Sequence, residues 1–203
     1  MPRDSSIAWA AAATHVAAAF GMLVLLRRGL PGFPEGERLA WMHAHPAAWL
    51  GGWMLWHLAA LSLLAFYAVL ALRFRGALSV TAMCAAAAGV SLDIACESRY
   101  MAVLPELTGD AFAALDRDLE VLIGYGANGL YTVALVLLVF AGWRELPKSA
   151  LALAVPVILA GFALALASLR HDPRLEMITS AILFPLFTLW IVLVGFWLRR
   201  SES

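Results

Sequence analysis

Cysteine and charge are both scarce in this sequence of 203 residues. Its two cysteines, Cys84 and Cys96, lie twelve positions apart in one apolar stretch. Within one helix these side chains are too far apart for a disulfide, and no CxxC pair occurs, so neither a disulfide framework nor thiol exchange is expected. Charged residues form 14% of the chain, against about 25% in soluble domains. The longest segments between apolar stretches, 27–45 and 103–118, are too short for a soluble core.

Several enzyme signatures are also missing. The sequence has no GxSxG, no HExxH and no phosphate-binding GxxxxGK[ST] motif. Because each motif places groups that its chemistry requires, the serine hydrolase, zinc protease and ATPase classes are excluded. The net charge is +0, and no basic, aromatic surface of a soluble kind is present, so nucleic acid is not expected as a partner.

Apolar residues, in contrast, form 63% of the chain. Stretches of about 20 apolar residues can cross about 30 Å of hydrocarbon as helices. Six occur, at Ile7–Leu26, Pro46–Leu72, Ala77–Ala102, Leu119–Trp143, Ala150–Leu169 and Leu175–Leu198. The alternating segments of a membrane β-barrel are absent. The sequence therefore predicts an all-α integral membrane protein, a six-transmembrane-helix bundle in which residues 1–203 form one polytopic domain.

Two features of the basic residues bear on topology. Arg27 and Arg28 follow the first stretch where a cleaved signal peptide would have small residues, so we expect that stretch to remain a helix. Basic residues divide evenly between the two sides, but on the side of both termini they concentrate in the short connections RFRG, RELPKS and LRRSES. This favours both termini in the cytoplasm. Eleven of the 14 acidic residues fall on the outer side, where the chemistry is expected, and the membrane is expected to be a cytoplasmic (inner) membrane of bacterial type.

The connections predict which spans are neighbours. Residues 73–76 and 144–149 are tight turns, so the second and third spans, and the fourth and fifth, are expected to be antiparallel pairs. Segment 27–45 begins as a turn-rich loop and is expected to form a short interfacial helix from Glu37. Thr108 or Asp110 is a candidate N-cap for a helix that continues into the fourth span.

Polar residues recur at helical spacing on the third and fourth spans. The third span carries Gly89, Asp93, Glu97 and Tyr100, and the fourth carries Glu120, Gly124, Asn128 and Tyr131, at intervals of four, four and three. This spacing puts each set on one face of its helix. Ionisable groups that face lipid cost several kcal/mol each, so both stripes are expected to face inward.

Depth along the helices places polar groups from four spans at one level. With a rise of about 1.5 Å per residue, Asp93 and Asn128 lie about 13 Å, and His15 and His57 about 16 Å, below the outer ends of their spans. Further polar residues lie between this level and the outer side: Glu97, Glu120, Glu176, Thr179 and Ser180. Together they predict an intramembrane polar cavity that opens outward.

A tryptophan stripe lies beside His57 on the second span. Trp49 is interpreted as part of the aromatic belt at the membrane interface. Trp53 and Trp56, at about 10 and 15 Å depth, are too deep for a belt and are expected to pack or to line the cavity.

Two interpretations are open for Asp93 and Glu97. In one they belong to a structural salt bridge, and Arg99 either lies at the membrane surface or pairs with Glu120 or Asp118. In the other they handle protons or bind a ligand, as buried ionisable groups in a membrane often do.

No cofactor is predicted, and two alternatives are kept. His43 and His45 form an HxH that can bind a divalent metal, and His15 and His57, at equal depth, can ligate one b-type haem. The charged run from Asp116 to Asp118 is interpreted as a solvated helix face.

The leading functional hypothesis is a cavity for a hydrophobic or amphipathic small molecule such as a lipid or isoprenoid. As an enzyme it would be an isomerase, cyclase or hydrolase in which Asp93, Glu97 and His57 perform acid–base catalysis. The residues predicted to bind the ligand are Asn128, Tyr131, Glu120, Tyr100, Trp53, Trp56 and His15. The alternatives are a small proton-coupled transporter or exporter, which at this size would need a homodimer or a narrow path, and a b-type haem redox or assembly subunit.

Overall fold

The computed structural model describes residues 4–202, which form helices joined by short connections and contain no strand. The elements are α1 (Asp4–Gly21), η1 (Met22–Leu26), η2 (Arg27–Gly29), α2 (Glu35–Ala44), α3 (Pro46–Phe74), α4 (Ala77–Ala102), η3 (Leu104–Glu106), α5 (Gly109–Val121), η4 (Leu122–Ala127), α6 (Asn128–Ala141), α7 (Lys148–Leu169) and α8 (Pro173–Ser201). In this part of the chain, six helical segments are long and apolar enough to cross a membrane. The predicted all-α architecture with six membrane helices is confirmed.

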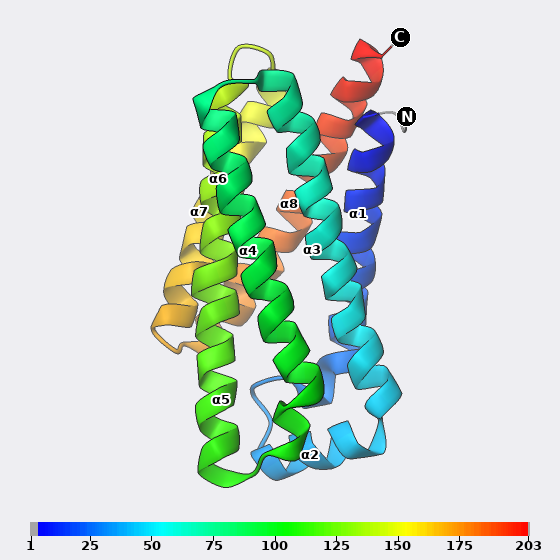
Figure 1. The fold of residues 1–203 in the computed structure, drawn as a ribbon, viewed down its shortest axis with the longest axis vertical. Helices are drawn as coiled ribbons and strands as arrows, with labels where there is room; N and C mark the ends of the chain where they lie inside the picture. The colour runs from blue at the N-terminus through cyan, green and yellow to red at the C-terminus, as the bar shows by residue number, and fades with distance from the viewer. Residues whose placement is uncertain (1–3, 203) are drawn as a thin grey trace.

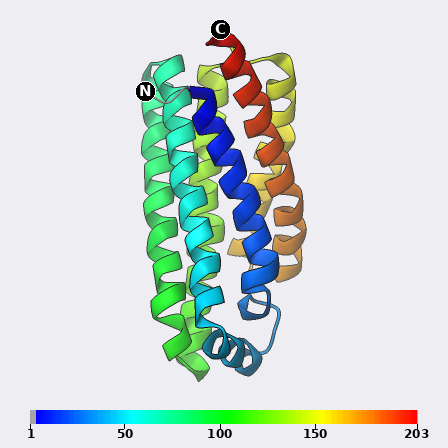
Figure 2. The same ribbon diagram turned by 90° about the vertical axis from the view of Figure 1, so that its right-hand side faces the viewer.

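The six spans form a closed ring. Around it the contacts run from α1 to α3, α4, α6, α7, α8 and back to α1. Figures 1 and 2 show the helices running roughly parallel to the long axis, with α4 beside α6 and α1 beside both α3 and α8. The predicted antiparallel pairs, α3 with α4 and α6 with α7, are therefore both present. A ring of this kind gives every span an inner face that is shielded from lipid.

The two ends of the bundle differ. The start of α1 and the end of α8 lie together at one end, which we call the terminal end, and α2 lies at the other, the α2 end (Figure 1). At the terminal end, the backbone N–H and the hydroxyl of Ser5 donate to the carboxylate of Glu202 at 2.9 and 2.8 Å. The cytoplasmic location of the terminal end stays a prediction.

Large apolar side chains cover the outside of the bundle. Leu23 is 70% exposed and Leu72 is 73% exposed, and similar residues occur on every span. Water would make such a surface costly, whereas lipid chains can cover it. The apolar outer surface is thus compatible with contact with lipid, as in a membrane protein.

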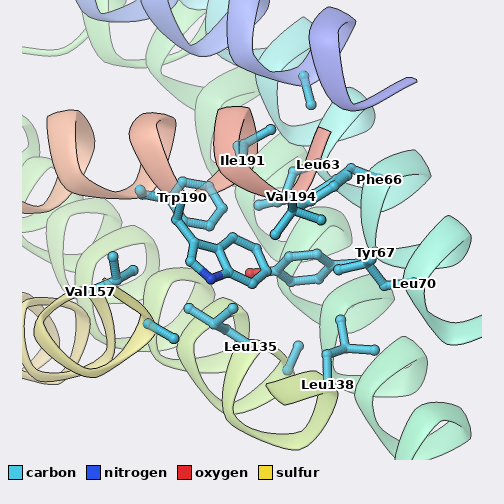
Figure 3. Close-up of a cluster of buried hydrophobic side chains, with 14 of the residues drawn as sticks. Leu63, Phe66, Tyr67, Leu70, Leu135, Leu138, Val157, Trp190, Ile191 and Val194 are labelled. Atoms are coloured by element: carbon cyan, nitrogen blue, oxygen red, sulfur yellow. The ribbon is translucent and has the colours of Figure 1, made fainter. Parts of the chain in front are cut away.

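Aromatic and aliphatic side chains fill the centre of the ring in its terminal half (Figure 3). Trp190 of α8 is fully buried, meets Phe66 edge to face with ring centroids 5.8 Å apart, and donates its indole N–H to the carbonyl of Ala150 at 3.1 Å. The Tyr67 hydroxyl lies 3.4 Å from the carbonyl oxygen of Tyr131. Both polar tips have partners, so the rings are buried without an unpaired donor. We call this group the terminal plug, because it closes the ring on that side.

The segment between α1 and α3 folds over the α2 end. Helix α2 begins at Glu35, two residues before the predicted start, and the Glu35 carboxylate accepts the backbone N–H of Gly109 at 2.7 Å. The His43 Nε2 atom lies 2.8 Å from the carbonyl oxygen of Pro105. These contacts fasten α2 to the connection between α4 and α5, so the segment caps the bundle.

The fourth span is one continuous helix made of α5, η4 and α6, as predicted. Thr108 occupies its N-cap position, although within the described chain its side chain makes no capping hydrogen bond. The span ends at Ala141, two residues before the predicted Trp143, because Gly142 begins the turn toward α7. The π-helical segment η4 in its middle was not predicted.

The terminal plug yields a stability prediction. Trp190→Ala removes a fully buried indole, and changes of this kind lower the free energy of unfolding by about 3–5 kcal/mol. Denaturation in mixed micelles measures the loss. Trp143→Ala is the matched control, because Trp143 is 59% exposed and its removal is expected to change the free energy by about 0.5 kcal/mol or less. Equal losses in the two variants would contradict the packing described here.

Candidate functional site

A cavity of about 230 Å³, the central pocket, lies inside the helix ring. Leu63, Tyr67, Leu135, Val157 and Phe187, which belong to the terminal plug, form its floor. Polar side chains on its walls come from five spans: His15, Asp93, Glu97, Tyr100, Glu120, Asn128, Tyr131, Ser168 and Glu176. The structure thus places Asp93, Glu97, Tyr100, Glu120, Asn128, Tyr131, Trp53, Trp56 and His15, all candidates from the sequence, around one space.

Asp93 joins α4 to α6. Its side chain is 7% exposed, and its Oδ2 atom accepts the hydroxyl hydrogen of Tyr131 at 2.9 Å. Gly89, one turn away on the same stripe, makes this approach possible, because a Cβ there would lie 2.8 Å from the Tyr131 ring. The two polar stripes predicted for the third and fourth spans therefore meet face to face. Tyr131 therefore binds one oxygen of Asp93, and Asp93 lines the pocket.

Glu97 lies between the pocket and His57. Its carboxylate Oε2 is 2.5 Å from Nδ1 of His57, and the side chains are 2% and 12% exposed. The imidazole Nδ1 also lies 3.3 Å from the backbone oxygen of Trp53. His57 is not among the described residues that line the pocket. The predicted pairing of His57 with Glu97 is present, and the role of His57 in acid–base chemistry stays a prediction.

Aromatic rings form the wall on the α3 side. Trp53 stacks on Tyr100 with centroids 4.6 Å apart and an angle of 5° between the rings, and Trp49 meets Trp53 edge to face at 5.5 Å. The Trp49 N–H donates to the backbone oxygen of Tyr100 at 2.9 Å. Trp49 is 3% exposed, so its interpretation as part of an interfacial belt is wrong. The indole N–H groups of Trp53 and Trp56 are buried and have no hydrogen-bond partner in the described chain.

The π-helical segment η4 shapes the wall on the α6 side. A π segment shifts the helix register, and such segments are frequent at functional sites. Here Asn128 donates its amide N–H to the backbone oxygen of Ile123 at 3.1 Å, so part of its hydrogen-bonding capacity is used within the helix. Gly124 lets Ser168 of α7 approach, because a Cβ at Gly124 would overlap the Ser168 hydroxyl. The glycines of GYGANG were the signal for this close packing.

A second, polar cavity of about 310 Å³ lies at the α2 end. We call it the vestibule. Pro31, Arg38 and Glu120 line both the vestibule and the central pocket, so the two cavities adjoin at these residues, which we call the neck. Glu120 at this neck and Glu176 at the start of α8 both line the central pocket, and the Glu176 Oε1 atom is buried without a hydrogen-bond partner in the described chain.

Arg38 and Asp116 form the ion pair that supports the neck. The guanidinium donates to both carboxylate oxygens of Asp116 at 2.7 Å and to the backbone oxygen of Gly29 at 2.8 Å. It also lies over the Phe112 ring, 5.0 Å from the centroid. The interpretation of Asp116 as solvated is wrong, because its side chain is only 13% exposed. Sequence reasoning missed Arg38, since its partner is 78 positions away and no periodicity joins them.

The remaining candidates do not form one centre. His43 and His45 have separate partners, the backbone oxygens of Pro105 and Trp41, and no group of three or more metal-ligating side chains occurs between residues 4 and 202. His15 lines the pocket and is bound to the backbone oxygen of Ala11 at 2.7 Å. His57 is not among the described residues that line this pocket, and the haem alternative stays a prediction.

Comparisons with protein-family models, with curated proteins and with solved structures found no match to this chain. The function must therefore be argued from the site itself.

The ion pair at the neck predicts a large single-mutant effect. Arg38→Met leaves the Asp116 carboxylate without its partner, and breaking a buried pair costs about 3–5 kcal/mol of the free energy of unfolding. The double variant Arg38→Met/Asp116→Leu removes both charges and is expected to recover most of this loss. Unfolding in mixed micelles is the measurement, with the exposed neighbour Arg117→Met as control. Equal stability of the single variant and the control would show that the pair contributes little.

The close approach of α6 and α7 predicts a second-site rescue. Gly124→Ala forces a new methyl group onto Ser168, and overpacking of this kind costs about 1–3 kcal/mol. Adding Ser168→Gly makes room and is expected to restore part of the stability. Gly51→Ala on α3, where a Cβ meets nothing within 4 Å, is expected to be neutral or slightly stabilising. The packing would be contradicted if both alanine variants behaved alike.

Proposed function

We propose that this protein binds a hydrophobic or amphipathic small molecule in the central pocket, and that Asp93 and Glu97 exchange protons with it. The observation that carries the proposal is the placement of these two buried carboxyl groups on the wall of a pocket with an apolar floor. Groups of this kind cost free energy to bury in a membrane helix, so their presence points to a function. With both termini in the cytoplasm, the vestibule opens toward the outer side.

The arrangement suits acid–base chemistry on a lipid-like or isoprenoid substrate, as in an isomerase, cyclase or hydrolase. Asp93 is held by Tyr131 at 2.9 Å, which fixes one oxygen and leaves the other for the substrate. Glu97 faces the pocket and touches His57 at 2.5 Å, so a proton can pass between them while the substrate stays on the pocket side. Within this proposal Asp93 and Glu97 are the acid–base groups, Tyr131 and Asn128 orient the substrate, and His57 is a positioning and proton-relay residue.

A proton-coupled transporter is the second candidate, because two adjoining cavities share the carboxyl group of Glu120. Transport across the bilayer would also need a path through the terminal half. That path is filled by the terminal plug, in which Trp190, Phe66 and Tyr67 are buried. Large movements of α3 and α8 would be required, so the geometry favours binding and chemistry over transport.

The proposal predicts that Asp93→Asn loses a bound molecule. The change keeps the shape of the side chain and removes its charge, and a hydrogen bond to a charged group contributes about 1.5–3 kcal/mol, so occupancy at limiting ligand is expected to fall about tenfold or more. Mass spectrometry of the lipids and small molecules extracted from purified protein measures the effect. Asp118→Asn on the exposed face of α5 is the control. An identical extract from the parent and Asp93→Asn would argue against the proposal.

A further inference from the structure

The central pocket has an excess of acidic groups. The carboxyl groups that line it belong to Asp93, Glu97, Glu120 and Glu176, whereas Arg38 is its single guanidinium among the described residues. That guanidinium is committed to Asp116 and Gly29. An anionic head group would meet these carboxyl groups with no free guanidinium to receive it. A cationic head group would compensate them.

The carboxyl groups are spread around the wall. Asp93 and Glu97 lie on α4, Glu120 on α5 and Glu176 at the start of α8. No three of these or other metal-ligating side chains in the described residues converge as a metal ion requires. A diffuse organic cation, such as an alkylammonium group, matches this distribution better than a compact metal ion does.

The aromatic wall supplies the second, independent feature. Trp53 and Tyr100 are stacked 4.6 Å apart, and Trp56 lies in the same wall. Aromatic rings are the usual environment of bound quaternary ammonium groups. Trp53 is 6% exposed, and its N–H has no hydrogen-bond partner in the part of the chain that the structure describes. Buried donors are nearly always paired, so this unpaired donor points to a bound molecule in the pocket.

The volume limits what can be enclosed. A cavity of about 150 Å³ holds benzene, so about 230 Å³ admits a small head group with its first few carbons. A longer tail must leave through the vestibule or between helices. The ligand would thus have a head inside the ring and a hydrophobic part outside it.

We propose that the central pocket recognises a cationic amphiphile, an amine or quaternary ammonium group attached to a hydrophobic tail. The head lies among Glu97, Glu120 and Glu176, and its charge faces the rings of Trp53 and Tyr100. This inference rests on the proposed binding function and adds the chemical class of the ligand.

Three probes with the same tail test the charge: dodecyltrimethylammonium, dodecylamine and dodecanol. Their binding to the full chain in nonionic micelles is measured by native mass spectrometry. Both cations are expected to bind about tenfold or more tightly than the alcohol, because charge-assisted contacts are lost with the alcohol. Comparison of the two cations separates the effect of charge from that of hydrogen bonding, since only dodecylamine can donate hydrogen bonds. Lipid extracts of the purified protein then show whether a membrane lipid with a cationic head group already occupies the site.

Matched variants tie binding to the pocket. Glu176→Gln is expected to weaken dodecyltrimethylammonium binding about tenfold, whereas Glu145→Gln, in the turn between α6 and α7, is expected to leave it unchanged. Trp53→Phe keeps an aromatic face and is expected to retain most of the binding, whereas Trp53→Leu is expected to lose it. Thermal unfolding of each variant shows whether it is folded.

The outcomes separate the two proposals. Tight cation binding that Glu176→Gln and Trp53→Leu weaken supports the inference. Equal binding of dodecanol and the cations overturns it and leaves the proposed function standing. Cation binding that no pocket variant changes is adsorption to the surface and also overturns it. If no probe binds and no molecule is extracted, the proposed function itself fails.

Discussion

The fold depends on the need to keep carboxyl groups away from lipid. A carboxylate that faces hydrocarbon costs several kcal/mol, and this chain places Asp93 and Glu97 within a membrane helix. A complete ring of helices solves the problem, because it gives every span a shielded inner face. The same ring creates the space that the carboxyl groups line. The ring therefore both shields the carboxyl groups and encloses the pocket. A change that opens the ring would expose the carboxyl groups to lipid and disrupt the pocket.

The two halves of the ring are stabilised by different interactions. The terminal half is packed solid, with the Trp190 indole hydrogen-bonded to the backbone of Ala150. The α2 half is held apart by longer-range polar contacts, chiefly the pairing of Arg38 with Asp116. Tight packing at one end lets the other end keep a cavity, because the plug contributes much of the apolar burial. A cavity among carboxyl groups lowers the stability of the fold, and this packing offsets the loss.

Much of the fold could be predicted from the sequence, because lipid leaves the backbone few choices. Span number, the antiparallel pairs and the continuous fourth span follow from hydropathy and turn length alone. The meeting of the Asp93 and Tyr131 stripes also follows from helical spacing. Errors arose where partners come from distant segments. Trp49 resembled an interfacial residue because nothing near it in the sequence indicates its contact with Tyr100, and Asp116 resembled a surface charge. Period and depth placed His57 near Glu97 but do not give which of the two side chains lines the cavity.

The position of His57 also bears on how the site would work. His57 contacts Glu97 and is not among the described residues that line the pocket, so it can stabilise or receive charge on Glu97 without taking space from the ligand. The Arg38 guanidinium lines the pocket but is committed to Asp116 and Gly29, so it does not compensate the pocket's own carboxyl groups. The charge of the pocket is thus left for the ligand to balance, which is the condition under which a cationic head group is preferred over a neutral one.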